Sequence, residues 1–171
     1  MTCDWRRPTS YQWHDQVNVV FVCTGNTCRS PLAEALARRT AQQRGIDVTF
    51  ASAGTGAALG SPANDAAILV GLERDLDLSR HRSRPLLPEV VTKDTVVLGM
   101  ASEHIPGIRA VVPNAHVYLL DEYGSRGASM RSVTDPYGGD LADYRIAADT
   151  IESMLAATLD RLVSEQTTGT T

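Results

Sequence analysis

A short apolar run near the N-terminus passes through a loop directly into the start of a helix. The segment from Val19 to Pro31 reads V-V-F-V-C-T-G-N-T-C-R-S-P, which predicts a strand that ends at Cys23. Ser30 and Pro31 then read as the cap and the first-turn residue of the helix. This order directs the positive end of the helix dipole at the loop, where it favours both a thiolate and a bound phosphate.

The rest of the chain alternates between strand-like and helical patterns. We predict strands at about 17–23, 48–53, 95–100 and 115–120, and helices near 31–44, 63–75, 86–91, 102–110 and 140–164. Gly45 is expected to end the first helix. The alternation predicts an α/β fold, a flavodoxin-like three-layer sandwich with a four-stranded parallel sheet and helices on both faces. In such a fold the first strand ends at a switch point, where ligands bind.

Length and composition fit one compact domain. The chain has 171 residues, 43% of them hydrophobic, enough for a core without disulfides or metal ions. We place the domain at residues 17–164, between an N-terminal extension (1–16) and a frayed polar tail (165–171). A net charge of −4 without a basic tract argues against nucleic acid as a partner. The sequence has no membrane-length apolar run and no apolar signal core, so we expect a cytoplasmic protein with reduced cysteines.

Cys23 and Arg29 share the first loop, six positions apart. This pair suits attack on phosphorus, with the Cys23 thiolate approaching in line while the Arg29 guanidinium holds two oxygens. Backbone N–H groups of the loop would grip the same oxygens. The residues expected to bind phosphate in this way are Thr24, Gly25, Asn26, Thr27, Cys28, Arg29 and Ser30. Gly25 permits a tight backbone path and Asn26 tolerates a left-handed conformation. The alternative interpretation is a buried cysteine near a surface arginine.

Cys28 follows Cys23 by five positions, close enough on a curled loop for a disulfide if the Cα atoms approach within about 6 Å. Such a bond would protect an oxidised nucleophile from irreversible acids, which makes Cys28 a possible redox partner. Otherwise Cys28 is a small buried hydrophobic residue. Cys3 lies in the extension without an evident role. We expect no cofactor and no metal site, because the four histidines are scattered and match no ligand spacing.

A second motif lies just ahead of the last predicted helix, where residues 134–139 read T-D-P-Y-G-G. With the C-x5-R-S of the first loop, it resembles the signature of the low-molecular-weight protein tyrosine phosphatase family, over about residues 17–162. The resemblance implies a flavodoxin-like fold and hydrolysis through a cysteinyl-phosphate. It implies that Asp135 protonates the leaving group and then activates water, and that Tyr137 walls the cleft. Without the resemblance, these residues read as a turn initiator and an aromatic packed at a helix start.

The resemblance also implies a support for the loop. Ser30 would donate its hydroxyl to the Cys23 sulfur, and a left-handed Asn26 would be held by Ser52 and His81. Ser52 lies in the segment S-A-G and His81 in L-S-R-H-R-S-R-P. Without the resemblance, Ser30 reads as a helix cap and the other two as satisfied polar groups.

Two positions bear on the substrate. Thr27 stands where tyrosine phosphatases of this family usually have a bulky aliphatic residue, and Gly138 where they usually have a second aromatic. Both departures thin the apolar walls around a phenyl ring. The pattern resembles the bacterial protein-arginine phosphatase branch, in which the Thr hydroxyl on the cleft wall helps to select phosphoarginine. We therefore expect a phosphorylated protein or peptide as substrate and inorganic phosphate as product, with phosphoarginine favoured and phosphotyrosine as the alternative.

Two further classes of protein use a similar loop. An arsenate reductase needs resolving cysteines downstream, and no cysteine follows Cys28. A non-catalytic phospho-binding module would have lost the nucleophile or the acid, whereas this chain retains both Cys23 and Asp135. Both classes are therefore remote alternatives.

Overall fold

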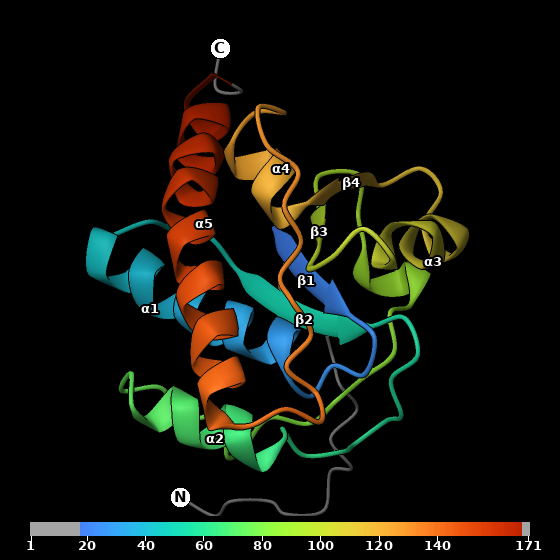
Figure 1. The fold of residues 1–171 in the computed structure, drawn as a ribbon. Helices are drawn as coiled ribbons and strands as arrows, with labels where there is room; N and C mark the ends of the chain where they lie inside the picture. The colour runs from blue at the N-terminus through green and yellow to red at the C-terminus, as the bar shows by residue number, and fades with distance from the viewer. Residues whose placement is uncertain (1–17, 169–171) are drawn as a thin grey trace, which may run out of the picture.

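A four-stranded parallel sheet forms the centre of the computed structural model, which describes residues 18–168 (Figure 1). The strands are β1 (Val19–Cys23), β2 (Phe50–Gly54), β3 (Val96–Gly99) and β4 (His116–Leu119), in the order β2-β1-β3-β4. β1 is an inner strand, and its first residue aligns with the first residues of β2 and β3. The parallel sheet predicted from the sequence is confirmed, and the end of β1 lies between two other strand ends.

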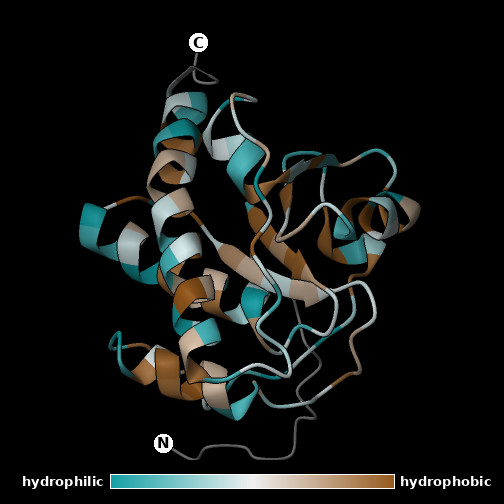
Figure 2. Ribbon diagram, in the orientation of Figure 1, coloured by the Kyte–Doolittle hydropathy of each residue, from teal (hydrophilic) through white to brown (hydrophobic). Residues whose placement is uncertain are grey.

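Helices cover both faces of this sheet. The main helices are α1 (Arg29–Arg44), α2 (Asp65–Leu72), α3 (His104–Val111), α4 (Leu120–Gly124) and α5 (Leu141–Thr168). Val19 and Phe21 of β1 pack in the core shared with α1 and α5, whereas Val20 and Val22 pack in the core shared with α3. Burial on both faces explains the uninterrupted apolar sequence of β1, which lies in the brown interior of Figure 2. The three-layer prediction is therefore confirmed.

One predicted helix is wrong in kind, and one short helix was not predicted. The helix expected at 86–91 is only a 3-10 turn at Pro88–Val90, because Val91 already returns to an extended conformation. The short helix α4 has no counterpart in the prediction, because the apolar run through β4 continues into Leu120 and reads as strand. Glu122 fixes the start of α4 by accepting a hydrogen bond from the Leu119 N–H at 3.1 Å.

The last helix is longer than predicted. α5 continues to Thr168, so residues 165–168 are helical rather than part of a frayed tail. Glu165 contributes to this extension because it pairs with Arg161, one helical turn before it, at 2.7 Å. The predicted extension (1–16), with Cys3, and residues 169–171 lie outside the described residues. Within residues 18–168, no helix combines the length and apolarity that crossing a membrane requires.

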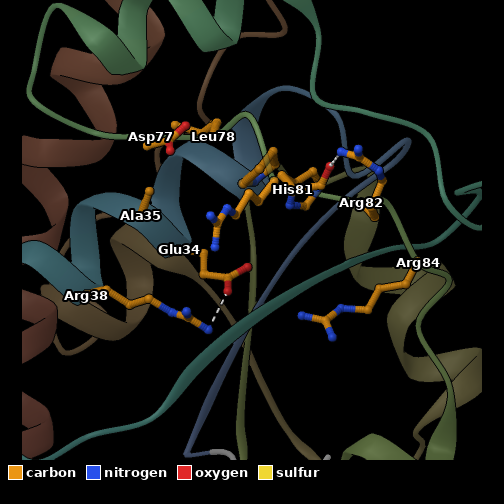
Figure 3. Close-up of a pocket in the computed structure, with 10 residues that line it drawn as sticks. Glu34, Ala35, Arg38, Asp77, Leu78, His81, Arg82 and Arg84 are labelled. Atoms are coloured by element: carbon orange, nitrogen blue, oxygen red, sulfur yellow. Dashed lines mark hydrogen bonds and ion pairs between the residues drawn. The ribbon is translucent and has the colours of Figure 1, made fainter. Parts of the chain in front are cut away.

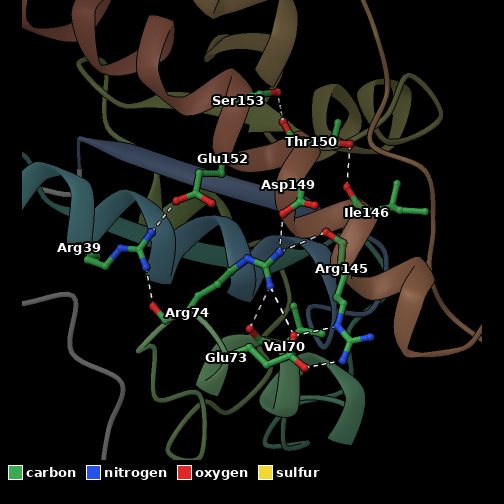
Figure 4. A network of polar contacts seen from close by, with 10 residues as sticks. All are labelled: Arg39, Val70, Glu73, Arg74, Arg145, Ile146, Asp149, Thr150, Glu152 and Ser153. Atoms are coloured by element: carbon green, nitrogen blue, oxygen red, sulfur yellow. Dashed lines mark hydrogen bonds and ion pairs between the residues drawn. The ribbon is translucent and has the colours of Figure 1, made fainter.

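Charged side chains join α1, the turn after α2 and the first turns of α5 (Figure 4). Arg74 in this turn pairs with Asp149 of α5, and Arg145 of α5 pairs with Glu73 at 2.6 Å. Arg39 of α1 donates to the Arg74 carbonyl at 2.5 Å. Single exposed ion pairs contribute little to stability, but several together fix the position of the helix end. The loop that carries the Asp-Pro motif runs directly into this fixed end of α5.

Candidate active site

The loop between β1 and α1 turns its backbone carbonyls away from its centre. The carbonyls of Cys23, Thr24 and Thr27 accept hydrogen bonds of 2.9 to 3.0 Å from backbone N–H groups of residues 55, 56 and 64. Among the described residues, no backbone N–H of residues 24–30 donates to a protein acceptor. These donors surround the end of β1 and are available to an anion.

Helix α1 begins two residues earlier than the sequence predicted. Its first residue is Arg29, and Cys28 occupies the N-cap position without a side-chain capping bond. The expectation that Ser30 caps the helix is therefore wrong. The Ser30 hydroxyl is buried in the first turn and lies 2.9 Å from the Cys23 Sγ, because the loop folds the first turn back over the end of β1. Ser30 thus lies within hydrogen-bond distance of the Cys23 sulfur, as the resemblance implied.

Asn26 holds the loop from behind. Its φ of 53° lies in the left-handed region, as predicted, and its side chain is fully buried. The carboxamide donates to the hydroxyls of Ser30 and Ser52, both at 2.9 Å, and accepts from the Arg84 N–H at 3.0 Å. His81 Nε2 donates to the Asn26 carbonyl at 2.7 Å. The structure therefore brings Ser52 and His81 to Asn26, although neither lines the cavity in front of the loop.

Gly54 was not singled out from the sequence beyond its place in S-A-G. It ends β2 beside the loop, and a Cβ at this position would lie 2.4 Å from the Thr24 carbonyl oxygen and 3.1 Å from the Asn26 nitrogen. Because both neighbours are backbone atoms, they cannot move aside without displacing the loop. Glycine is the residue that permits this approach.

Arg29 lies under the loop with only 3% of its side chain exposed. One guanidinium nitrogen donates to the Val133 carbonyl at 3.1 Å, and the other lies 3.0 Å from a carboxylate oxygen of Asp135. Val133 is itself buried and donates its N–H to the Met100 carbonyl at the end of β3 at 2.8 Å. These contacts bring Asp135 to Arg29 across more than a hundred residues. Glu103 approaches the same guanidinium at 3.9 Å.

Asp135 is half exposed, with 50% of its side chain accessible, and is not enclosed by an apolar wall in this structure. Its second carboxylate oxygen accepts from the Tyr137 N–H at 3.1 Å, which closes the turn that the Asp-Pro sequence predicts. The Tyr137 side chain is 74% exposed at the rim of the cavity. The turn therefore fixes the backbone of Asp135 and Tyr137 while both side chains remain accessible at the rim of the cavity.

His104 is a site residue that the sequence did not single out. It is buried at the start of α3, and its Nδ1 accepts the Ala101 N–H at 3.0 Å. The ring proton therefore resides on Nε2, which lies 3.2 Å from the Thr24 hydroxyl and 3.5 Å from the Arg29 guanidinium. Burial, and then the charge of Arg29, lower the pKa of His104 and keep the ring neutral.

Cys28 and Thr27 form one side of the cavity. Cys23 and Cys28 are both free, buried thiols. The Cys28 sulfur lies 3.5 Å from the Tyr144 hydroxyl of α5 and 3.7 Å from the Thr27 hydroxyl. Burial raises the pKa of Cys28, which favours its neutral thiol.

Most of the predicted site residues line a cavity of about 400 Å³ at the end of β1, whereas Asn26 and Ser30 lie behind it with Ser52 and His81. Its lining comprises Cys23, Thr24, Gly25, Thr27, Cys28, Arg29, Ala58, Ser61, Asp135 and Tyr137. Ala58 and Ser61, from the segment between β2 and α2, had no sequence signal. Among the described residues, no group of histidine, cysteine and carboxylate side chains could hold a metal ion. The arrangement brings together the thiols of Cys23 and Cys28, the Arg29 guanidinium and the free N–H donors of the loop, with the Asp135 carboxylate at the entrance.

The chain is similar to known proteins over most of its length. The family model for "Low molecular weight phosphotyrosine protein phosphatase" matches residues 18–168. The chain is 36% identical to a protein-arginine-phosphatase of Bacillus subtilis over 143 residues, which cover 81% of this chain and 92% of that protein. It is also 36% identical to low molecular weight protein-tyrosine phosphatase A of Mycobacterium bovis over 146 residues, 82% of this chain and 88% of that protein. Among solved structures, a mutant of the YwlE arginine phosphatase with a phosphorylated active-site serine has a TM-score of 0.80 and 34% identity, covering 85% of this chain and 95% of that chain.

Proposed function

This chain belongs to the low molecular weight phosphotyrosine protein phosphatase family, and we propose that it hydrolyses phosphoarginine in proteins through a cysteinyl-phosphate on Cys23. The observation that carries the proposal is the convergence of the Cys23 sulfur, the buried Arg29 guanidinium and the free N–H groups of residues 24–30. A thiolate at the centre of such a ring of donors is placed to attack a phosphoryl group that the ring holds.

The first step transfers the phosphoryl group to sulfur. A bond forms between the Cys23 sulfur and phosphorus while the bond from phosphorus to the leaving nitrogen or oxygen breaks. Arg29 and the loop N–H groups stabilise the negative charge on the phosphoryl oxygens. The leaving atom keeps the electron pair of the broken bond and takes a proton from Asp135 at the entrance of the cavity.

The second step releases inorganic phosphate. Asp135, now ionised, takes a proton from water as the water oxygen bonds to phosphorus. The sulfur leaves with the electron pair of the bond to phosphorus, and the Ser30 hydroxyl at 2.9 Å donates to the thiolate that forms. Both steps use only groups of this chain and water, so we propose that the enzyme needs no cofactor.

Thr27 and Asp135 favour phosphoarginine over phosphotyrosine. The Thr27 hydroxyl gives the cavity wall a polar group where an aliphatic side chain would cover an aromatic ring. In the acid form that the first step requires, the carbonyl oxygen of Asp135 can still accept an N–H of a guanidinium, for which a phenol has no equivalent. The protein-arginine-phosphatase of Bacillus subtilis and the protein-tyrosine phosphatase A of Mycobacterium bovis are each 36% identical to the chain, so phosphotyrosine is the second candidate substrate.

The thiolate chemistry also indicates where the enzyme works. A nucleophilic cysteine and a neighbouring free thiol persist in a reducing compartment, so we propose the cytoplasm. The partner is a phosphorylated protein or peptide, and neither nucleic acid nor a membrane is part of the proposal.

The test compares hydrolysis of phosphoarginine and phosphotyrosine peptides under reducing conditions. We expect a higher kcat/KM for phosphoarginine, loss of turnover in Cys23→Ser with phosphate binding largely retained, and loss of both in Arg29→Lys. A lysine cannot reproduce the two-pronged grip of the guanidinium. Arg109→Lys, on the exposed face of α3, is the matched control and should behave as the parent. Appreciable turnover in Cys23→Ser would exclude the covalent mechanism.

A further inference from the structure

A second cavity lies between α1 and the segment that precedes β3 (Figure 3). It has a volume of about 310 Å³ and shares no lining residue with the candidate active site. Four of its lining residues are arginines, namely Arg38, Arg80, Arg82 and Arg84. We refer to it as the arginine pocket.

The arginine pocket has more positive than negative side chains, in a chain whose net charge is −4. Its two carboxylates are Glu34 and Asp77. The Asp77 carboxylate accepts a hydrogen bond from the Ser79 N–H, two residues after it, at 2.9 Å. Arg82 donates to the carbonyls of Ser79 and His81 and, within residues 18–168, forms no ion pair with a carboxylate. The surplus positive charge is therefore a local property of this pocket.

Glu34 occupies the centre of the arginine pocket. Figure 3 shows Arg38 and Arg84 directed toward it from opposite sides. One Glu34 oxygen pairs with Arg38 at 2.7 Å, and the other accepts the Ser52 hydroxyl at 2.6 Å. A single carboxylate thus lies among several guanidinium groups, an environment that suits an additional anion.

The walls of the arginine pocket contact the buried residue that supports the catalytic loop. The Arg84 N–H donates to the Asn26 side chain, and the His81 ring donates to the Asn26 carbonyl. Ser52 bridges Glu34 and Asn26 through hydrogen bonds of 2.6 and 2.9 Å. Three separate contacts therefore join this pocket to one loop residue.

We propose that the arginine pocket is a second phosphate-binding site, coupled through Asn26 to the loop that holds the phosphoryl group. Guanidinium groups match the planar pairs of oxygens of a phosphate, and the pocket offers several of them. Only Pro31, Ala35 and Leu78 of the lining are apolar, so the pocket offers little surface to an aromatic or lipid ligand. The phosphate is either free inorganic phosphate or a phosphorylated side chain of a bound protein.

Amide chemical shifts in a phosphate titration separate the two sites residue by residue, without any catalytic readout. In the parent, amides of residues 79–84 should shift with a saturation curve distinct from that of residues 24–30. In the double variant Arg80→Gln/Arg82→Gln, the phosphate affinity reported by the amides of residues 79–84 should fall at least tenfold. The control Lys93→Gln/Arg109→Gln removes the same charge from exposed positions elsewhere and should retain both curves.

Coupling is measured in the same titrations. Because coupling is reciprocal, the affinity read at residues 24–30 should change at least twofold in the double variant relative to the control. Equal affinities there would refute the coupling, and pocket amides that do not shift in the parent would refute the site. A peptide with a phosphonate analogue of phosphoserine identifies the source. Tighter binding than inorganic phosphate indicates a phosphorylated side chain, and weaker binding indicates the free ion. Failure of the proposed phosphatase activity would leave these binding curves unchanged.

Discussion

Replacing Asn26 with alanine tests the structural basis of the catalytic loop. The substitution removes three hydrogen bonds of 2.9, 2.9 and 3.0 Å, to Ser30, Ser52 and the Arg84 N–H. The side chain has no accessible surface, so water cannot replace the lost partner without opening the loop. It also leaves alanine at a φ of 53°, where asparagine is tolerated better than other residues with a Cβ.

The expected loss of stability follows from these contacts. Each hydrogen bond contributes about 1 kcal/mol net, so the three together contribute about 3 kcal/mol. The left-handed backbone adds about 1 kcal/mol for alanine. A loss of about 4 kcal/mol corresponds to a fall in Tm of roughly 8 to 16 °C for a chain of this length.

Urea unfolding and thermal melting of the parent and Asn26→Ala measure this loss. Asn114→Ala, at an exposed position before β4, is the control and should change stability by less than about 0.5 kcal/mol. At a temperature where all three proteins are folded, kcat/KM for an aryl phosphate should fall at least tenfold in Asn26→Ala alone. If Asn26→Ala loses no more stability than the control, the contacts of Asn26 do not hold the loop.

Four further changes test separate parts of the site. Asp135→Asn should slow aryl phosphates with poor leaving groups far more than those with good ones, and equal slowing would exclude Asp135 as the acid. Thr27→Ile should shift kcat/KM from phosphoarginine toward phosphotyrosine peptides by roughly 10- to 200-fold, and an unmoved ratio would refute its role in selection. Peroxide should inactivate the parent reversibly through a Cys23–Cys28 disulfide but Cys28→Ala irreversibly, which peptide mapping and thiol rescue would show. Burial lowers the pKa of His104, so the stability that its neutral ring contributes is present above pH 6.5 and is lost as the pH falls through the folded-state pKa. On acidification below pH 6.5, the urea midpoint should therefore drop less in His104→Gln than in the parent.

Local sequence was sufficient for those parts of the site that neighbours along the chain determine. The order of β1, loop and α1 follows from apolar and turn residues that are contiguous, and so does the left-handed Asn26. The helix boundary was less predictable. Ser30 followed by proline fits a capping pattern, but the hydroxyl bonds the Cys23 sulfur instead, because the loop returns over the strand end. Local pattern therefore located the loop but misassigned one hydroxyl.

Contacts between distant segments explain what the sequence did not reveal. His104 lies 80 positions from Thr24, and no spacing rule relates the two. Its contact depends on the end of β3 lying next to the end of β1, which is a property of the strand order. The same holds for Glu34, which reaches the loop through Ser52 of the neighbouring strand β2. Residues that act through a partner leave little trace in a single sequence, because each alone is an ordinary polar residue.

The pairing of Arg29 with Asp135 connects the geometry to the choice of substrate. In the structure the two side chains are 3.0 Å apart, so the Asp135 carboxylate occupies N–H donors of Arg29 that a phosphoryl group needs. A bound substrate must therefore displace Asp135 toward the leaving group. Phosphoarginine offers the displaced Asp135 carboxyl group a second guanidinium, with N–H donors for its acceptor oxygen in place of those of Arg29. A phenyl ring offers none, and the half-exposed carboxylate would return to water. The exchange of one guanidinium partner for another therefore favours phosphoarginine at this entrance, in the same direction as the Thr27 hydroxyl on the cavity wall.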